Sequence, residues 1–345
     1  MAPARLRLAT YNVEWMNALF DDSGRLLADN QLSARYKITR ADQLAALGIV
    51  FTALDADGIM IIEAPDQGSR RSTVQALENF ASFFRLRTRK AIIGFPSETE
   101  QEIAFLYDPD RLGVAHDPRG EPASSRGAPG APRFDTALRQ DIDDDGVDEL
   151  VIFSKPPLEL AVQADGTTLH LIGVHAKSKT PHGTVTPEEF KRISIENRRK
   201  QLAECHWLRA RAETHLAAGD SLIVMGDFND GPGLDHYEKL FGRSGIEEVL
   251  GPNAPPAMRL TDPHAAMALT HHTGLRPATA RFWLAPHKCY FDALLDFIMV
   301  SPDLAARNPV WRIWHPFNDP GVMDVPELRE AVLTASDHFP VTLDL

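Results

Sequence analysis

The chain has 345 residues, of which 43% are hydrophobic and 24% are charged, a composition typical of soluble globular proteins with a sizeable core. Its formal net charge of −12 argues against a protein that coats DNA non-specifically. It leaves a nuclease open, because a metal ion in an acidic site presents positive charge to phosphate. No run approaches the roughly 18 consecutive apolar residues of a membrane span.

The start of the chain and the two cysteines set further expectations. The first residues lead directly into Leu8–Val13, which is typical of a first strand and not of a secretory leader, so we expect a cytoplasmic protein. Cys205 and Cys289 have neither a neighbouring cysteine nor a zinc-finger spacing, and we expect two free thiols. The sequence shows no feature from which a protein partner is inferred.

Short runs rich in Val, Ile, Leu and Phe predict strands that are buried on at least one face. In chain order they are Leu6–Val13, Gly58–Glu63, Ala91–Ile93, Ile103–Tyr107, Leu150–Phe153, Leu158–Val162, Thr168–His175, Ser221–Gly226, Phe297–Val300 and Val341–Leu345.

Amphipathic stretches between these runs predict helices over Ala41–Leu54, Ser72–Phe83, Thr186–Ala217 and Leu234–Phe241. The third is long enough to be one helix or a broken one. Its start is well marked, because Thr186 suits an N-cap and is followed by Pro187 and two glutamates.

The order of elements mixes hairpin-like strand pairs with strand–helix units, which predicts an α/β sandwich of two layered, mixed sheets with helices outside. Two stretches interrupt it. Asp117–Arg133, rich in Pro, Gly, Ala and Ser, is predicted to be a mobile loop, and Gly251–Ala280 shows little periodicity. Because the motifs described next fall on both sides of both stretches, we expect residues 1–345 to form a single domain.

The segment Leu222–Asn229 is an apolar strand that runs into a glycine and then two polar side chains. Alternation along an extended chain places Asp227 and Asn229 on the same side. Taken alone, these residues also suit a turn with an Asx hydrogen bond. Similar polar residues at the ends of other strands favour a site over a turn.

Near the C-terminus, Asp296 lies in the apolar run Leu294–Val300, where an unpaired carboxylate is costly. It therefore needs a partner. A histidine such as His338, which follows Asp337, is suited to this because the acid orients it and keeps it protonated.

Three more polar residues stand at strand ends, namely Asn12, Glu63 and His175. Together with the Asp227 and Asp296 strands and the Asp337-His338 pair, they supply what a metal-dependent phosphoesterase needs. Carboxylate oxygens hold Mg²⁺, imidazoles bind phosphate and stabilise its charge, and an aspartate aligns the attacking water.

The sequence resembles the endonuclease/exonuclease/phosphatase superfamily, also called DNase I-like, which includes nucleases, sphingomyelinases and inositol-polyphosphate 5-phosphatases. The resemblance rests on six short segments that occur in the family's order and span nearly the whole chain. They are Thr10–Val13, Ile61–Glu63, Gly173–Ser178, Gly226–Asn229, Leu295–Ile298 and Ser336–His338. It implies a four-layer α/β sandwich, with two mixed β-sheets face to face and helices outside.

The resemblance also implies roles for these residues. Glu63, helped by Asn12 and Asp337, would hold one Mg²⁺ or Mn²⁺ ion. Asp227 would orient or deprotonate the attacking water. Asn229 would lie beside Asp227 and contact the substrate. Two imidazoles would contact the phosphate, His338 paired with Asp296 from one side and His175 from the other.

The chain departs from the family's usual pattern in two places. Glu63 is followed by Ala-Pro-Asp, where a segment closer to Gln-Glu-Val is usual, and Asp296 is followed by Phe297 where a His or Tyr is usual. Neither change touches a proposed catalytic atom. Both weaken an assignment to a subfamily.

Other residues near these motifs are weaker candidates. Lys177 and Ser178 follow His175 and are candidates for substrate phosphate, although a solvated lysine at the start of a loop explains Lys177 equally well. Tyr107 is predicted to be a strand residue. Arg139 lies where some members supply a phosphate-binding arginine.

The acidic segment Asp141–Glu149 begins like a calcium-binding loop, with Asp141, Asp143, Asp145 and Gly146 at the right spacing. The twelfth position, where such a loop needs glutamate, is Ile152. We therefore favour a solvated acidic turn over a Ca²⁺ site.

A group of histidines and a pair of tryptophans say less about function. His264, His271 and His272 lack zinc spacing and are expected at the substrate rim or the surface. Trp311 and Trp314 are interpreted as strand residues that face one side, and core packing is favoured over base stacking.

Three functions fit these observations. The first is a nuclease or phosphodiesterase that acts on DNA or RNA. The second is a phosphatase or phosphodiesterase that acts on a small-molecule or lipid phosphoester, which the acidic balance fits at least as well. The third is a binding module that has kept the fold, and it ranks below the others because the full set of proposed metal and phosphate ligands is present. Whether cleavage is endo or exo, and which oligomer forms, the sequence does not indicate.

Overall fold

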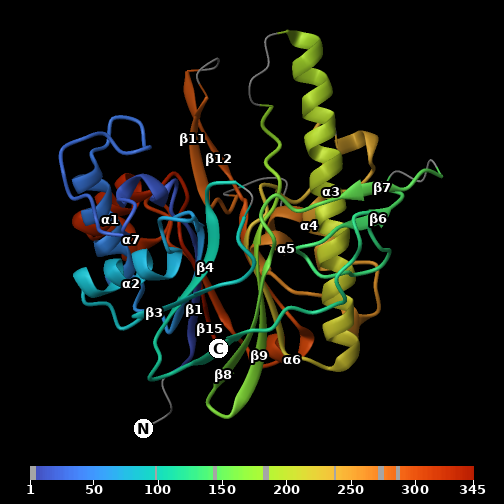
Figure 1. The fold of residues 1–345 in the computed structure, drawn as a ribbon, viewed down its shortest axis with the longest axis horizontal. Coiled ribbons are helices and arrows are strands. Elements are labelled where there is room, and N and C mark those ends of the chain that lie inside the picture. The colour runs from blue at the N-terminus through green and yellow to red at the C-terminus, as the bar shows by residue number, and fades with distance from the viewer. Residues whose placement is uncertain are drawn as a thin grey trace.

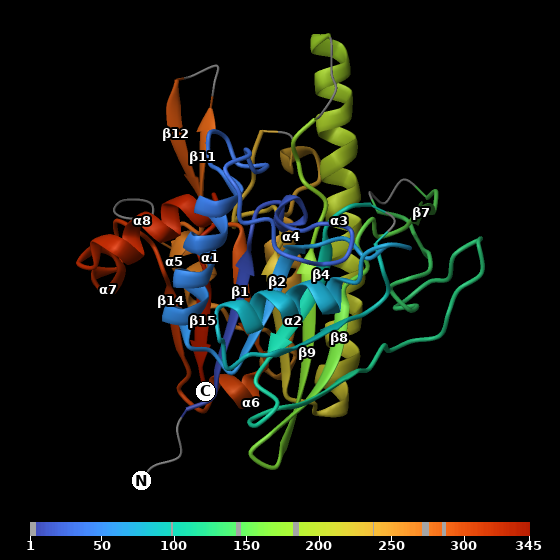
Figure 2. The same cartoon turned by 60° about the vertical axis from the view of Figure 1, so that its left-hand side comes forward.

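The computed structural model describes residues 5–97, 99–142, 146–181, 186–236, 238–270, 276–284 and 288–345. Two large mixed sheets pack face to face (Figures 1 and 2). One sheet has six strands in the order β14 (Val310–Ile313), β15 (Val341–Asp344), β1 (Arg7–Asn12), β2 (Gly58–Ala64), β4 (Glu102–Tyr107) and β3 (Lys90–Ile93). The other has five, in the order β13 (Asp296–Val300), β10 (Leu222–Asp227), β9 (Thr167–His175), β8 (Leu158–Ala164) and β5 (Gly113–His116).

Helices cover the outer face of each sheet. The six-stranded sheet carries α1 (Arg40–Leu54), α2 (Thr73–Phe83), α7 (Pro320–Met323) and α8 (Pro326–Ala335). The five-stranded sheet carries α3 (Pro187–Ala218), α4 (Gly245–Leu250) and α5 (Pro263–Thr270), while the short α6 (Pro302–Ala305) follows β13. The four layers of the predicted DNase I-like α/β sandwich are therefore confirmed.

Three apolar clusters hold these layers together. Alternate residues of one strand point to opposite faces, so Leu169 and Leu171 of β9 lie between the sheets while Ile172 and Val174 pack against α3. The sheets approach closely at Gly173, where an added Cβ would lie 2.4 Å from the Met60 sulfur of the other sheet.

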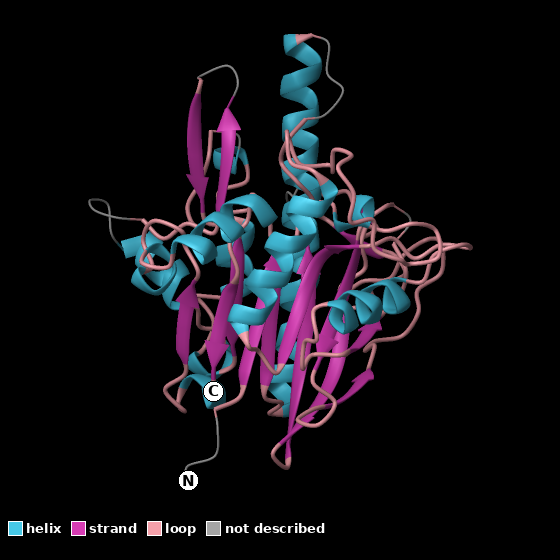
Figure 3. Cartoon of the chain, turned by 90° about the vertical axis from the view of Figure 1, so that its left-hand side faces the viewer, coloured by secondary structure: helices cyan, strands magenta, loops and turns pink. Residues whose placement is uncertain are grey.

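Two hairpins lie outside the sandwich. β6 (Leu138–Gln140) pairs with β7 (Glu149–Val151), and β11 (Ala280–Leu284) pairs with β12 (Cys289–Ala293). The β11–β12 hairpin and the N-terminal half of α3 both project beyond the same edge of the two sheets (Figures 1 and 3).

Strand direction places the ends of four central strands at that edge. β1 and β2 run parallel in one sheet, and β9 and β10 run parallel in the other. β13 is antiparallel to β10, and its first residue, Asp296, pairs with the last, Asp227. The polar residues that end these strands are therefore brought together across both sheets.

The sequence missed five strands. Four of them, β5, β11, β12 and β14, are edge or hairpin strands with at most one buried residue each, and β6 has three residues. Such strands lack the apolar alternation of a half-buried strand. The prediction that Trp311 and Trp314 face one side was wrong, because residues three apart in a strand face opposite ways. Trp311 packs toward the core between the sheets, and Trp314 belongs to the cluster under the outer helices.

The first two predicted helices are confirmed within one residue, and the third is unbroken over 32 residues with a capping box at Thr186. The predicted helix Leu234–Phe241 was wrong. It holds a 3₁₀ turn, Glu238–Leu240, which follows reciprocal hydrogen bonds between Asp235 and Glu238 and ends at Gly242 in the left-handed region. The helices α4, α5, α6, α7 and α8 were not predicted.

The two predicted loops differ from each other. Residues 117–133 form neither helix nor strand, but hydrogen bonds from Trp207 and Arg211 of α3 fasten carbonyl oxygens of Ala131 and Pro132. Gly251–Ala280, in contrast, contains α5 and a 3₁₀ turn at Pro256–Met258. The two cysteines are free, as expected. Among the described residues, no helix combines the length and apolar character needed to cross a membrane.

Candidate active site

A cavity of about 1110 Å³ opens at the edge where the four strands end. Its floor carries polar side chains from both sheets, and one wall is apolar, with Phe282, Leu284 and Phe291 of the β11–β12 hairpin. Of the residues that the sequence singled out for a site, all but Asp296 line it: Asn12, Glu63, His175, Lys177, Ser178, Asp227, Asn229, Asp337 and His338.

Asp227 lies at the centre of the floor and is buried. Its Oδ2 atom accepts a hydrogen bond of 3.0 Å from Asn12 Nδ2 and lies 3.9 Å from the Nε2 atoms of both His175 and His338. Its Oδ1 accepts the backbone N–H of Asn229 at 2.8 Å. One carboxylate is thus surrounded by an amide and two imidazoles from three other segments of the chain.

The turn after β10 fixes this carboxylate. Gly226 has φ 142°, and an added Cβ would lie 2.0 Å from the carbonyl oxygen of Val174, so only glycine fits beside β9. Asn229 is in the left-handed region, with φ 50°, and its amide donates to the carbonyl of Ala176. The Asx turn is therefore present, and it holds Asp227 in the candidate site.

His338 is positioned by Asp296 from behind the floor. The distance from His338 Nδ1 to Asp296 Oδ2 is 2.8 Å, and both side chains are buried. This hydrogen bond leaves Nε2 facing the cavity. The predicted pairing of these two residues is present in the structure. Asp296 does not line the cavity itself but orients the His338 ring that does.

Glu63 is held by the residues around it. Its Oε2 accepts the Trp15 N–H at 2.8 Å and the Gln101 amide at 2.9 Å, while its Oε1 faces Asn12 Nδ2 at 3.4 Å and His175 Nε2 at 4.0 Å. Its φ of 65° is uncommon for a side chain other than Gly, Asn or Asp, and it aims the carboxylate at the floor.

Burial controls the charges of these groups. It raises the pKa of Asp227 to about 7, against the effect of the charged His338, and it raises the pKa of Glu63. Burial lowers the pKa of His175 well below its usual range. It also disfavours a charged His338, but the charges of Asp296 and Asp227 outweigh it and raise the pKa of His338 to about 10. One imidazole is thus neutral and the other is an imidazolium.

The donor set fits a hard divalent cation. Glu63 and Asp337 supply carboxylate oxygens to the cavity. The amide nitrogen of Asn12 faces Glu63 and Asp227, and its oxygen accepts the Glu14 N–H at 3.0 Å. Asp227, Asp296 and His338 also have ligand atoms within 4.8 Å of one another. The last two are already joined by a hydrogen bond, so the carboxylates of Glu63 and Asp337 are the better candidates for holding a cation.

Lysine side chains also line the cavity, in contrast to the apolar wall that the hairpin supplies. Lys177 and Ser178 lie there as the sequence suggested, together with Lys155 and Lys179. Burial lowers the pKa of Lys155, although the carboxylates of Glu63 and Asp227 favour its charged form. Lys155, which precedes strand β8, was not predicted from the sequence, where it is a lone lysine between Ser154 and Pro156.

Two residues of α3 that support the floor were also not predicted from the sequence. Gln201 donates through Nε2 to the carbonyl oxygens of Lys177, Phe228 and Asn229, at 2.9, 3.1 and 2.9 Å. Glu204 accepts the N–H of Lys177 at 2.7 Å. Gln201 joins the two loops that follow His175 and Asp227, and Glu204 holds the first of them. Nothing in the local sequence of these two residues marks them.

Several weaker candidates lie away from the cavity. Tyr107 is a strand residue that stacks on Phe105, as predicted, and Arg139 forms an exposed ion pair with Asp148. His264 was expected at the rim or surface, but it is mostly buried beside Asp262, and burial lowers its pKa to about 4.

Two other predictions fall partly or wholly on undescribed residues. His271, His272, Asp143 and Asp145 lie outside the described residues. Of the acidic segment, the structure describes a turn in which Asp141 accepts the N–H of Gly146 and Glu149 accepts that of Ile142.

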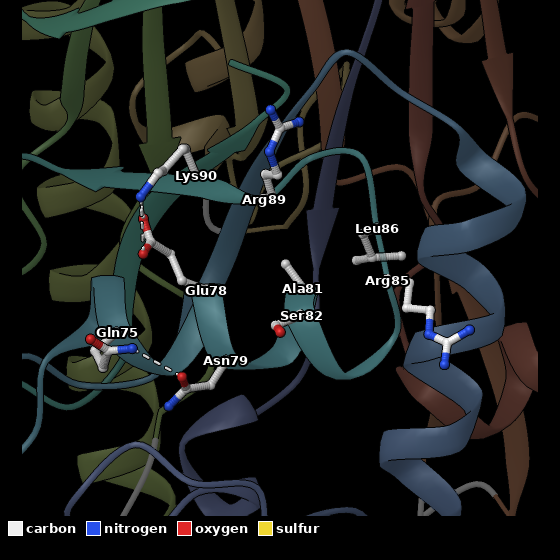
Figure 4. A pocket seen from close by; sticks show the side chains of 9 residues that line it. All are labelled: Gln75, Glu78, Asn79, Ala81, Ser82, Arg85, Leu86, Arg89 and Lys90. Carbon is white, nitrogen blue, oxygen red and sulfur yellow. Dashed lines mark hydrogen bonds and ion pairs between the residues drawn. The ribbon is translucent and has the colours of Figure 1, made fainter. Parts of the chain in front are cut away.

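A second hollow, of about 530 Å³, lies between α2 and β3, far from the strand ends (Figure 4). Its Lys90 pairs with Glu78, and its Arg89 pairs with Asp108 and Asp110. It lacks the convergent acids and imidazoles of the first cavity, which we take as the candidate active site.

Comparisons with known proteins agree with this geometry. The profile of the Endonuclease/Exonuclease/phosphatase family matches residues 108–338. Among solved structures, the chain is similar to TDP2 from C. elegans, with 12% identity over 99% of this chain and 74% of that chain and a TM-score of 0.50. It is equally similar to an AP endonuclease from Archaeoglobus fulgidus, with 12% identity over 98% of each chain and a TM-score of 0.50. These likenesses show the fold alone. No curated protein matches the sequence.

Proposed function

The chain belongs to the endonuclease/exonuclease/phosphatase family of metal-dependent phosphoester hydrolases, and from this premise we propose that it hydrolyses a phosphodiester by direct attack of water at the cavity between the two sheets. One observation carries the proposal. The buried carboxylate of Asp227 faces two imidazoles at 3.9 Å and lies across the Asn12 amide from Glu63. Because both sheets supply this floor, residues 1–345 would act as one domain.

In this proposal Asp227 orients the attacking water and accepts its proton. His338, held as an imidazolium by Asp296, donates from Nε2 to a phosphate oxygen and stabilises the negative charge that develops there. Neutral His175 contacts the same phosphate from the opposite side. Asn229, Lys177 and Ser178 lie where they would contact the rest of the substrate.

Glu63, Asp337 and Asn12 would hold the metal, and Mg²⁺ is the ion that their oxygen donors suit best, with Mn²⁺ as a substitute. When bound, it supplies Lewis-acid stabilisation of charge on a phosphate oxygen. No part of the reaction requires a nucleophilic side chain, so we expect no covalent enzyme intermediate.

We infer that a nucleic acid is the substrate, because three separate features favour a long polyanion: the lysines at the cavity, its large volume, and the two prongs formed by α3 and the β11–β12 hairpin. A small or lipid phosphoester is the second candidate. The exposed aromatic rings of Trp283, Tyr290 and Phe291 on the hairpin favour it, because they suit an apolar substrate or surface as well as they suit bases.

The first experiment is nicking of supercoiled plasmid with Mg²⁺, beside small phosphodiesters and monoesters and an EDTA control. We expect turnover that EDTA abolishes and that Asp227→Asn and His338→Ala each lower about 10³-fold. Asp165→Asn is the matched control, since Asp165 is exposed in the β8–β9 turn, and it should stay within about two-fold of the wild type.

The outcomes separate the candidates. Nicking that requires both metal and Asp227 supports a nuclease. Turnover of small phosphoesters without nicking keeps the chemistry and moves the substrate class. Wild-type turnover in either site variant, with metal bound, would refute the role given to that residue.

A further inference from the structure

A second cluster of metal-ligating side chains lies at the opposite end of the five-stranded sheet. It consists of His170 near the start of β9, His215 in the last turn of α3, and Asp220 just after that helix. One ligand atom from each lies within 4.8 Å of the others. His175 lies five positions after His170 in β9, about 16 Å away at about 3.3 Å per residue, so this cluster is distinct from the candidate active site.

The backbone brings these three residues together. α3 ends at Gly219 in the left-handed region, with φ 78°, and the following turn returns the N–H of Asp220 to the carbonyl of His215 at 3.0 Å. The chain then enters β10 beside β9, where His170 donates its N–H to the carbonyl of Ser221 at 2.8 Å. The positions of the side chains are thus fixed by ordinary backbone hydrogen bonds.

The ligand atoms converge on the carboxylate of Asp220. His215 Nδ1 lies 2.8 Å from Asp220 Oδ2, and His170 Nε2 lies 3.8 Å from Asp220 Oδ1. The two imidazole rings are 5.0 Å apart between centroids. Donors of a tetrahedral site with bonds of 2.0–2.1 Å lie about 3.4 Å apart, so these separations fall on either side of the required value.

An outer carboxylate is also in place. The second ring nitrogen of His170, Nδ1, faces Asp117 Oδ2 at 3.7 Å, while Asp117 is itself held by Arg119 at 2.8 Å. Metal-bound histidines commonly direct their other nitrogen to a carboxylate in this way, which fixes the tautomer and turns the free nitrogen toward the metal.

We propose that His170, His215 and Asp220 form a binding site for a transition-metal ion, with Zn²⁺ as the best fit. Two imidazoles and one carboxylate are a mixed nitrogen and oxygen set that suits Zn²⁺ and Co²⁺, whereas Mg²⁺ prefers oxygen alone. Burial lowers the pKa of His215, which keeps the ring neutral and able to act as a ligand. A water molecule would complete the coordination.

This site would stabilise the fold and take no part in the reaction. Binding replaces the hydrogen bond between His215 and Asp220, and the N–H proton of the neutral ring moves from Nδ1 to Nε2. Because protons compete with the metal for the ring nitrogens, the affinity falls as the pH falls. The ion would fasten the C-terminal end of α3 to the start of β9, and α3 carries Gln201 and Glu204 beneath the active site.

The test uses the full chain without a histidine tag, stripped with chelator and titrated with Zn²⁺ by calorimetry and with Co²⁺ by visible absorption, in saturating Mg²⁺. Glu63→Gln in parallel removes binding at the active site. We expect one equivalent of Zn²⁺ that Mg²⁺ does not displace and that Glu63→Gln retains. His170→Gln and His215→Gln should weaken it at least about 100-fold, and Asp117→Asn about 10- to 100-fold.

His264→Gln is the matched control, because His264 is about as buried as His170 and belongs to no such cluster among the described residues. It should bind Zn²⁺ as the wild type does, and Zn²⁺ should raise its melting temperature but not that of His215→Gln. If His215→Gln fails to fold, Asp220→Asn decides, because its amide still accepts from His215. Wild-type affinity in the folded ligand variants, or no Zn²⁺ beyond what Mg²⁺ displaces, overturns the proposal.

Discussion

The buried carboxylates at the two ends of the sandwich have different partners. At the end near both chain termini, Asp57 and Asp108 are buried and both accept hydrogen bonds from Arg87, at 2.7 and 3.1 Å. At the other end, Asp227 and Glu63 face an amide and imidazole nitrogens, and their closest histidine contacts are 3.9 and 4.0 Å. One fold therefore contains buried carboxylates that are hydrogen-bonded to a cation and buried carboxylates that are not, since the His338 imidazolium lies 3.9 Å from Asp227.

We infer from this difference that one end of the sandwich contributes to the stability of the fold and the other to catalysis. A buried carboxylate that contacts an arginine is compensated for the loss of water, and removing the arginine leaves a costly charge. A buried carboxylate that faces other acids and imidazoles stays poorly compensated until a cation or substrate arrives. The active end is thus expected to lower the stability of the fold in exchange for function.

The largest expected effect comes from removing the cation at the compensated end. Arg87→Met leaves Asp57 and Asp108 without their shared partner, and we expect the free energy of unfolding to fall by about 3 kcal/mol. This is at the low end for buried pairs, because the Arg87 side chain is 35% exposed and Arg111 lies 3.8 Å from Asp57. Urea unfolding measures the change, and kcat of the folded variant should not change.

Arg192→Gln is the control for this variant. Its pair with Glu196 is exposed on the surface of α3, and its loss should cost no more than about 0.5 kcal/mol. Two outcomes would contradict the separation of stability and catalysis between the two ends. One is a loss of turnover in folded Arg87→Met, and the other is a loss of stability no larger than that of Arg192→Gln.

An intermediate effect is expected from Glu204, the buried carboxylate of α3 under the active site. Burial raises its pKa to about 7, although Lys200 and the N–H of Lys177 favour the ionised form. Since the folded-state pKa is above the unfolded one of about 4.3, this group favours folding fully below that value. The contribution is lost as the pH rises through 7.

Between pH 5 and pH 8, the wild type should therefore lose about 2 kcal/mol more unfolding free energy than Glu204→Gln, which keeps an acceptor for Lys177 and does not titrate. Urea unfolding at both pH values gives the difference. Parallel pH profiles for the two proteins would mean that Glu204 stays ionised and is compensated like Asp57.

The sequence predicted the parts of the fold that are buried on both sides. β1, β2, β9, β10 and β13 are apolar runs, and the polar residues at their ends were enough to indicate a site. The edge strands β5 and β14 were missed because none of their residues is buried, so they lack the apolar run of a core strand. The helix α8 was missed although its signal is present, with a proline at its start and apolar residues at positions 328, 331, 332 and 335.

Side chains that act across the fold were beyond the reach of local patterns. Gln201 and Glu204 support the active site from the middle of a helix, and Lys155 reaches it from a loop. Their importance follows from the packing of α3 on β9 and β10. The same is true of His170 and His215, which are 45 residues apart in the sequence numbering and meet only when that helix is in place.

The smallest effect is also the most direct test of the comparison. Asp227→Asn replaces a buried carboxylate by an amide of the same shape whose oxygen still accepts from Asn12 or from the N–H of Asn229. In EDTA at pH 8, we expect its free energy of unfolding to exceed that of the wild type by about 1 kcal/mol, because a poorly compensated charge is removed. Asp57→Asn should change in the opposite direction, because it deprives Arg87 of a partner. Equal losses in both variants, measured by urea unfolding, would mean that Asp227 is as well compensated as Asp57 and that the active end carries no cost in stability.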